Sequence, residues 1–227
     1  RSPMSMLSVL IKTYYAQQEK IDPADITVVA VMPCVAKKFE AERPEHRFDD
    51  EMPYTDAVLT TRELAWMIKA YGIDFTGLPG SEFDAPLGFS TGAADIFGTT
   101  GGVMEAALRT AVENLTGETL ERIDFEVVRG VTGIKEASLD VEGRQMHIGV
   151  ANTLQSAKQL LDCALSGEKD YHLLELMACP GGCIGGGGQP RYTDDSGGLR
   201  RMEAIYKEDA GKPLRKSHEN PEIQALY

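Results

Sequence analysis

The four cysteines are the residues of this chain with the clearest capacity for chemistry. At positions 34, 163, 179 and 183 they are too few for the disulfide framework of a secreted domain of 227 residues, so metal binding or catalysis is the better interpretation. Cys179 and Cys183 lie four residues apart in a glycine-dense stretch, Met177-Ala178-Cys179-Pro180-Gly181-Gly182-Cys183-Ile184-Gly185-Gly186-Gly187-Gly188. Glycines let the backbone approach a bulky inorganic group and point N–H groups at sulfide. Soft thiolate ligands indicate an iron-sulfur cluster, although ligand type alone also allows zinc.

A second cysteine motif, Met32-Pro33-Cys34, is predicted at a turn between a strand and a helix. The β-branched run at residues 26–31 reads as a buried strand, and residues 36–42 favour a helix. The amide dipoles of that helix favour a thiolate at Cys34, and the ammonium group of Lys37, one turn further on, can bind an anion. Taken singly, Cys34 could equally well be a buried structural thiol and Lys37 an ordinary surface lysine. Their occurrence together favours a functional site.

Cys163 and two methionines have plainer interpretations. Cys163 lies in the predicted amphipathic helix at residues 153–166, where a small buried thiol is common and a ligand would be isolated, so we interpret it as structural. Met32 and Met177 each stand two residues before a cysteine, which suits either a soft apolar lid over a metal or ordinary core packing.

The elements that must position these residues alternate between helices and strands. Helices are predicted at residues 7–17, 36–42, from Thr60 onward, 102–115 and 153–166, and strands at 26–31, 125–128, 137–141, 146–151 and 173–177. Residues 43–53 read as a loop and 72–102 as largely irregular. This alternation predicts an α/β fold, in which ligand sites lie where strands end.

Composition and charge limit the kinds of partner. With 42% apolar residues, the chain can bury the core of one large domain or of two small lobes. The formal net charge of -12 would repel nucleic acid and anionic lipid surfaces, and no apolar run reaches the ~20 residues of a membrane-spanning helix. Since the first residue is Arg1, we interpret the chain as a fragment or a processed form. We expect a cytoplasmic protein, with the periplasm left open.

Several segments resemble the signatures of the iron-only hydrogenases. The two that carry cysteines are Met32-Pro33-Cys34-Val35-Ala36-Lys37-Lys38-Phe39-Glu40-Ala41-Glu42-Arg43 and Glu175-Leu176-Met177-Ala178-Cys179-Pro180-Gly181-Gly182-Cys183. The resemblance continues through residues 84–88, 96–109 and 216–221, so it covers essentially the whole chain. It implies an α/β catalytic-domain fold of two lobes with the cluster between them. It also implies a partial catalytic domain at residues 1–195 and a mostly helical tail, similar to the family's small subunit, at residues 196–227.

The resemblance implies an H-cluster, in which a 4Fe-4S cube is bridged through one cysteine sulfur to a diiron unit with CO, cyanide and azadithiolate ligands. The reaction it implies is the reversible oxidation of H2 and reduction of protons. Cys34, Cys179 and Cys183 become cube ligands, and Cys183 also becomes the bridge. Lys37 becomes the hydrogen-bond partner of a cyanide. The residues expected to line the diiron pocket are Pro3, Met32, Phe97 and Met177.

One signature of the family has no counterpart in this chain. A Thr-Ser-Cys-Cys-Pro type segment supplies the fourth cube ligand and a proton-relaying cysteine, and we expect it before Arg1 or on a companion chain. Met4 also stands where many active members have glutamine. The electron partner, expected to be ferredoxin, a cytochrome or a nicotinamide-linked complex, would be selected by cluster domains outside this sequence.

Members of the same superfamily have two other functions that this chain could share. The prelamin A recognition factor-like branch keeps similar cysteine motifs without the diiron centre and assembles iron-sulfur clusters, and sensory relatives of the hydrogenases form a further group. Three segments look like the enzyme branch: residues 84–88, residues 97–109 and the sequence Gly188-Gln189-Pro190. We therefore expect an enzyme.

Overall fold

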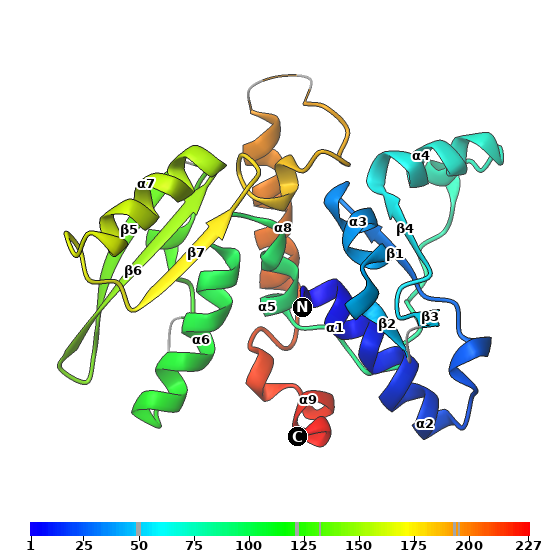
Figure 1. Cartoon of the computed structure of the whole chain (residues 1–227), viewed down its shortest axis with the longest axis horizontal. Coiled ribbons are helices and arrows are strands. Elements are labelled where there is room, and N and C mark those ends of the chain that lie inside the picture. Colours follow the sequence, from blue (N-terminus) through cyan, green and yellow to red (C-terminus); the bar gives the residue numbers. More distant parts are fainter. Residues whose placement is uncertain (49–50, 121–122, 132, 193, 195) are drawn as a thin grey trace. The chain divides into compact units, whose positions relative to one another are not determined.

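The computed structural model describes residues 1–48, 51–120, 123–131, 133–192, 194 and 196–227. The chain divides into two units, each built of helices and strands (Figure 1). The first unit contains Arg1–Leu87 together with Gly187–Pro190, and the second contains Gly88–Gly186 and Arg191–Tyr227. Among the described residues, none of the helices combines the length and the apolar character that a membrane crossing needs.

The first unit consists of short strands that lead into helices. Its elements are α1 (Pro3–Leu10), a π-helical turn (Ile11–Tyr15), α2 (Ala16–Glu19), β1 (Val29–Met32), α3 (Ala36–Glu42), β2 (Arg47–Phe48), β3 (Met52–Pro53), β4 (Ala57–Thr60) and α4 (Thr61–Ala70). β1 and β4 are parallel and in register, with Met32 opposite Thr60 at their carboxyl ends. α4 begins at a capping box formed by Thr60 and Glu63.

The helices predicted in the first unit are confirmed. The strand predicted as buried at residues 26–31 is shorter and shifted, at Val29–Met32, and Val29 and Val31 are exposed. The helix at residues 36–42 has the predicted bounds, and the first predicted helix forms part of a longer helical segment that starts at Pro3. Residues 43–53, predicted as loop, contain the antiparallel pair β2 and β3, while 49–50 lie outside the described residues. Pairs this short carry too little sequence pattern to be recognised.

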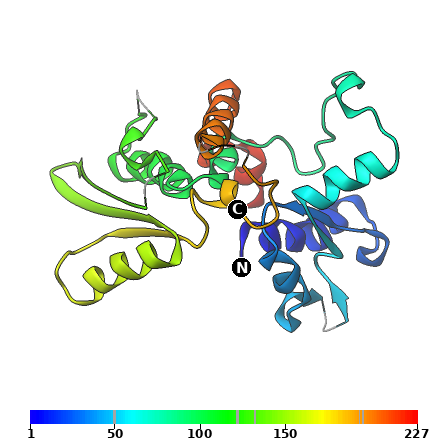
Figure 2. The ribbon, with the colours of Figure 1, turned by 90° about the horizontal axis from the view of Figure 1, so that it is seen from above.

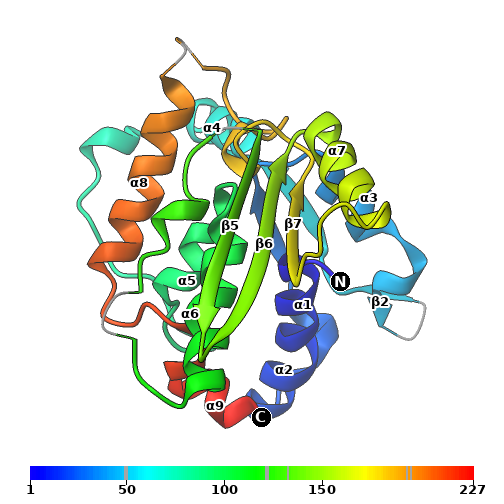
Figure 3. The same ribbon diagram turned by 90° about the vertical axis from the view of Figure 1, so that its left-hand side faces the viewer.

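The second unit is a three-stranded sheet with helices on both faces (Figure 2). Its elements are α5 (Gly92–Asp95), α6 (Gly102–Thr116), β5 (Ile134–Val141), β6 (Arg144–Asn152), α7 (Leu154–Leu165), β7 (Leu173–Met177), α8 (Gly197–Gly211) and α9 (Pro221–Leu226). β5 and β6 form an antiparallel hairpin, and β7 is parallel to β6 (Figure 3). β6 and β7 are joined through α7, so both run toward the same end of the sheet.

Alternation along β6 divides the core of the second unit into two layers. Ile148 and Val150 pack with Met104 and Leu108 of α6, whereas Ala151 packs with Leu160 and its neighbours on α7. This is the period-2 pattern of a strand buried on both faces.

The strand predicted at residues 125–128 is wrong. Glu126–Val128 forms a 3₁₀ turn, closed by hydrogen bonds from Val128 N–H to the Phe125 carbonyl and from Arg129 N–H to the Glu126 carbonyl. The apolar residues that suggested a strand do not alternate between two faces. Val128 inserts into the core beside α6 and Phe125 packs against the same core, while Val127 remains exposed.

Candidate metal centre

In the first unit, Cys34 lies in the turn between β1 and α3, as predicted, and its thiol is half-buried. The segment Gly187–Pro190 holds this turn, because the N–H of Gly188 donates to the Pro33 carbonyl at 2.8 Å. A Cβ at Gly188 would lie 3.0 Å from the Pro33 carbonyl carbon and 2.9 Å from the Thr60 side chain. Glycine is therefore required for the close approach that fixes the Cys34 turn.

Lys37 is held by an ion pair on its own helix. Its Nζ lies 2.5 Å from Oε2 of Glu40, and the two side chains are only 23% and 19% exposed. The hydroxyl groups of Ser2 and Ser5 donate to the other oxygen of the same carboxylate. Burial alone would raise the pKa of Glu40, but the hydrogen bonds from Lys37 and the serines lower it to about 2. These contacts tie the start of α1, at Pro3, to the helix that carries Lys37.

Met32 is half-buried and packs on the small core of Met4, Ala41 and Val58. Pro3, the first residue of α1, is exposed. The four site residues predicted in this unit thus lie on or beside three elements, α1, β1 and α3. They are Pro3, Met32, Cys34 and Lys37.

In the second unit, Cys179 and Cys183 lie in the loop directly after β7. Cys179 is half-buried and Cys183 is exposed. Tight turns shape the loop, with hydrogen bonds from Gly182 N–H to the Cys179 carbonyl and from Gly186 N–H to the Cys183 carbonyl, at 3.0 and 2.9 Å. The motif of the first unit also follows the end of a strand, so the two cysteine motifs have the same local setting.

Two glycines in the loop adopt conformations that other residues rarely take. Gly181 and Gly182 have φ of +73° and +90°, and a Cβ at Gly182 would lie 2.6 Å from the backbone N of Thr100. Gly181 is held on both sides: its N–H donates to Oδ1 of Asn152 and its carbonyl accepts from Thr100 N–H, both at 3.0 Å. The end of β6 and the turn before α6 therefore fix the backbone between the two cysteines.

A buried carboxylate beneath this loop was missed in the sequence. Glu175 of β7 accepts hydrogen bonds from the N–H groups of Gly101 and Met104, at 2.6 and 2.7 Å, and so caps α6. Burial raises the pKa of Glu175, although the two hydrogen bonds act to lower it. The nearby Nζ of Lys135 donates to the carbonyl of Thr100 at 3.0 Å, and burial lowers the pKa of Lys135 to about 8. A single carboxylate within the apolar strand Leu-Leu-Glu-Leu-Met is the signal that could have revealed it.

The other residues singled out in this unit have separate positions. Phe97 is half-buried and packs with Ile96, Ala93 and residues of α8. Met177 ends β7, and its sulfur would be 2.8 Å from a Cβ at Gly182, so it packs under the cysteine loop. Cys163 lies on α7, where burial and Glu168 raise the pKa of its thiol.

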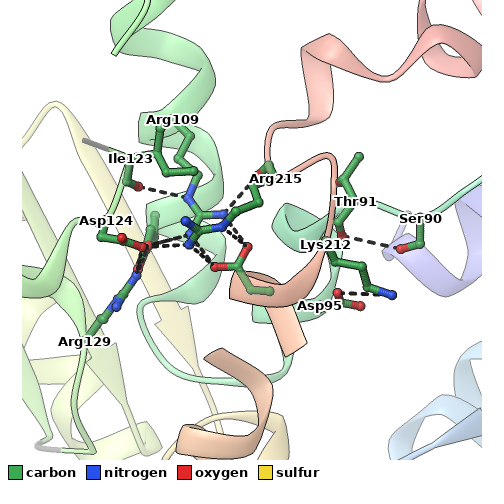
Figure 4. Close-up of polar contacts among 11 residues, drawn as sticks. Ser90, Thr91, Asp95, Arg109, Ile123, Asp124, Arg129, Lys212 and Arg215 are labelled. Atoms are coloured by element: carbon green, nitrogen blue, oxygen red, sulfur yellow. Dashed lines mark hydrogen bonds and ion pairs between the residues drawn. The ribbon is translucent and has the colours of Figure 1, made fainter. Parts of the chain in front are cut away.

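A buried network of ions joins α6 to α8 (Figure 4). The guanidinium group of Arg109, fully buried, contacts the buried carboxylates of Glu105 and Asp209 at 2.8 Å each. Asp209 also accepts from Arg215 at 2.6 Å. Arg109 further donates to the carbonyls of Ile123 and Arg215, so its donors are used within the protein. These paired charges connect α8 to α6 within the second unit.

The cysteine loops fit an iron-sulfur group on donor chemistry and on shape. Residues 179–186 contain sulfur donors but no carboxylate or imidazole, which disfavours hard cations such as magnesium or calcium. The glycines at 181 and 182 draw the backbone close to its neighbours where a side chain would collide. Exposed Cys183 and half-buried Cys179 can therefore present thiolates from the loop after β7.

The sequence profile described as iron only hydrogenase large subunit, C-terminal domain, matches residues 1–187, and that of the iron hydrogenase small subunit matches residues 198–227. The chain belongs to the iron-only hydrogenase large-subunit family, of which it carries the C-terminal domain. Its fold agrees with that family. A solved variant of the HydA1 [FeFe]-hydrogenase of Chlamydomonas reinhardtii is 40% identical, with a TM-score of 0.82 over 100% of this chain and 64% of the other.

Among curated relatives, the NADP-reducing hydrogenase subunit HndD of Solidesulfovibrio fructosivorans is 55% identical over 100% of this chain and 39% of its own length. The periplasmic [Fe] hydrogenase large subunit of Nitratidesulfovibrio vulgaris is 50% identical over 84% of this chain and 45% of its own. The cytosolic iron-sulfur assembly component 3 of Mus musculus is more distant, at 33% identity over 100% of this chain and 48% of its own. The chain therefore spans less than half the length of these relatives.

Proposed function

We propose that this chain forms part of an iron-only hydrogenase that catalyses the reversible oxidation of H2 and reduction of protons. The observation that carries the proposal is the pair of cysteine motifs, each in a glycine-held turn directly after a strand. It is supported by 55% identity to a hydrogenase subunit, compared with 33% to an assembly factor. The enzyme is therefore favoured over a cluster carrier.

In this proposal, Cys34, Cys179 and Cys183 are ligands of a 4Fe-4S cube, and Cys183 also bridges to a diiron unit with CO, cyanide and azadithiolate ligands. The exposure of Cys183 supports a bridging role, because a shared sulfur needs room for two metal centres. Cys179 is less exposed and is followed by Pro180, which crowds the residue before it. When bound, the H-cluster supplies the redox chemistry that converts protons and electrons into H2 and back.

The remaining site residues hold and shield that group. Lys37 donates a charge-assisted hydrogen bond to a cyanide, and Glu40 keeps its side chain ordered before the group binds. The apolar side chains assigned to the diiron pocket exclude water; they are Pro3, Met32, Phe97 and Met177.

The proposal also assigns the parts of the protein that complete the enzyme. A segment before Arg1 or a companion chain supplies the fourth cube ligand and the proton-relaying cysteine. An electron carrier such as ferredoxin or a nicotinamide-linked complex exchanges electrons with the cube. Residues 1–195 act as the partial catalytic domain, and residues 196–227 act as the small-subunit-like tail.

Maturation of the full-length protein tests this function. We expect bound iron and sulfide, an electron paramagnetic resonance (EPR) signal of the cube, infrared bands of CO and cyanide after the diiron unit is introduced, and H2 evolution with a reduced carrier. A protein that binds the cube but shows neither the infrared bands nor H2 turnover after maturation would be a carrier, and the hydrogenase proposal would fail.

A further inference from the structure

The tail contacts the loop that carries Cys183. The carbonyl oxygen of Ile184, the residue after Cys183, accepts a hydrogen bond from Nη1 of Arg201 at 2.7 Å and another from the hydroxyl of Tyr192 at 3.2 Å. Arg201 lies on α8, within the part of the chain that resembles a small subunit. Because a carbonyl has two lone pairs, these two donors satisfy it completely. The loop is therefore attached to α8 directly beside the cysteine assigned as the bridge.

Packing holds both donors in place. The guanidinium group of Arg201 lies over the ring of Tyr192, 4.5 Å from its centroid. The same ring lies against Gly197 at the start of α8, where a Cβ would be 2.6 Å from it. A Cβ at Gly185 would lie 3.4 Å from the Tyr192 hydroxyl, so the ring also borders the cysteine loop. Arg201 and Tyr192 thus form one packed unit on the Ile184 carbonyl.

Helix α8, which carries Arg201, is itself held in place by buried contacts. Asp209, near the other end of α8, is fully buried between Arg109 and Arg215. Ile205 and Tyr206 of α8 pack on the buried core of Ala93 and Ile96. A cation placed on such a helix keeps its position, so Arg201 presents a fixed positive charge next to the loop.

We propose that Arg201 and Tyr192 are positioning residues for the Cys183 thiolate, and that Arg201 also sets the reduction potential of the cube. The inference rests on the proposed function, because it assigns a role toward the cluster. Anchoring the Ile184 carbonyl fixes the 3₁₀ turn Cys183–Gly185 and with it the direction of the cysteine sulfur. A nearby cation stabilises an added electron on an anionic cluster, so it raises the potential. The small-subunit-like tail is then part of the cluster site.

The matched variants are Arg201→Met and Arg200→Met. Both remove one charge from the same helix, but the side chain of Arg200 is 54% exposed and pairs with Asp194, not with the loop. Arg201→Lys keeps the charge with fewer donors, and Tyr192→Phe removes only the longer hydrogen bond. These two conservative changes keep the test decisive if Arg201→Met folds poorly.

Hydrogen exchange in the cluster-free, full-length protein measures the anchoring without any cluster. We expect the amides of Gly185 and Gly186 to exchange roughly ten- to a hundredfold faster in Arg201→Met, the range expected when a charged hydrogen bond is lost. The increase should be smaller in Tyr192→Phe. Arg200→Met should match the unchanged protein. Equal exchange in Arg201→Met, Tyr192→Phe and Arg200→Met would overturn the proposal.

Potentiometric titration of the cube, followed by EPR before the diiron unit is introduced, measures the second part. We expect a lower midpoint potential in Arg201→Met, recovery toward the original value in Arg201→Lys, and no shift in Arg200→Met. An unshifted potential in Arg201→Met would overturn the electrostatic role. If the unchanged protein bound no cube while Arg201→Met still loosened the loop, the proposed function would fail and the anchoring by Arg201 would stand.

Discussion

Lys37 and Glu40 form an ion pair at 2.5 Å, one turn apart on α3. The carboxylate also accepts hydrogen bonds from two serines at the start of α1, so it is bound on both sides. Lys37 therefore has an ordered side chain before any anion is present. An ammonium group restricted in this way loses less conformational entropy when it binds a ligand.

Replacing Lys37 with alanine should cause loss of the diiron unit or of H2 turnover. Under the proposed function, the variant loses a charge-assisted hydrogen bond to a cyanide, worth about 1.5 to 3 kcal/mol when desolvated. Infrared spectra and H2 evolution of the matured protein measure this. Lys38→Ala is the control; it removes the same charge from the neighbouring position, where Nζ contacts the Val58 carbonyl and the carboxylate of Glu63 and not Glu40. Unchanged CO and cyanide bands with normal H2 evolution in Lys37→Ala would contradict the role.

Replacing Glu40 with glutamine should change how stability depends on pH. The pKa of Glu40 is lowered from 4.5 to about 2 in the folded protein, so its carboxylate stabilises the fold above pH 4.5. This contribution is lost as the pH falls toward 2. Urea unfolding at several pH values should show a lower free energy of unfolding for Glu40→Gln near neutral pH and a smaller loss on acidification. The exposed Glu42→Gln should follow the unchanged protein; identical curves for all three proteins would refute the expectation.

The cysteines should differ in the damage that their replacement causes. Under the proposed ligand assignment, Cys183→Ala should abolish H2 turnover and detach the diiron unit, because Cys183 is proposed to supply the bridging sulfur. Cys179→Ala should mainly damage the cube. Cys163→Ala should leave both intact, since Cys163 lies on α7 and not in the cysteine loop. EPR and infrared spectra of each matured variant give the comparison. Retention of the coupled signal in Cys183→Ala, or its loss in Cys163→Ala, would show that the ligands are wrongly assigned.

Replacing Asp209 with alanine should destabilise the second unit strongly. It removes the buried carboxylate that Arg109 and Arg215 share and leaves the buried guanidinium group of Arg109 with Glu105 as its remaining close acidic partner. Removing one partner from a buried ion pair costs about 3 to 5 kcal/mol. Denaturant unfolding measures the loss. The control is Asp162→Ala, which breaks an ion pair with Lys158 whose side chains are 75% and 61% exposed, and should cost about 0 to 1 kcal/mol. Equal losses in the two variants would mean that the network contributes no more than a surface pair.

Local sequence patterns were sufficient to predict the local structure around Cys34 and Cys179. Proline and helix-forming residues after a β-branched run predicted the turn at Cys34, and the apolar strand before the glycines placed Cys179 at its end. The helix at Ala36–Glu42 and the strand at Leu173–Met177 were predicted with their observed bounds. These features depend on neighbours in the sequence, which is why they could be recognised.

Features that depend on distant partners could not be predicted. The buried pair of Arg109 and Asp209 joins residues far apart in the chain, and each alone resembles a surface charge on a helix. The hydrogen bond from Gly181 N–H to the side-chain amide of Asn152 likewise joins distant residues, because Asn152 lies at the end of a different strand. The apolar run ending at Val128 had the composition of a strand but, among the described residues, no neighbouring strand with which to pair.

The return of Gly187–Pro190 to the first unit affects the order of events during synthesis. A ribosome releases residues 1–87 early, but the bonds from Gly188 to Pro33 and from Arg62 to Gly188 need a stretch of chain made roughly a hundred residues later. In a nascent chain, the turn at Cys34 therefore lacks these hydrogen bonds until the loop with Cys179 and Cys183 has also been translated. Truncated products that lack residues 187–190 would lack both hydrogen bonds, so the time at which the ribosome completes this later segment determines when the turn at Cys34 can form.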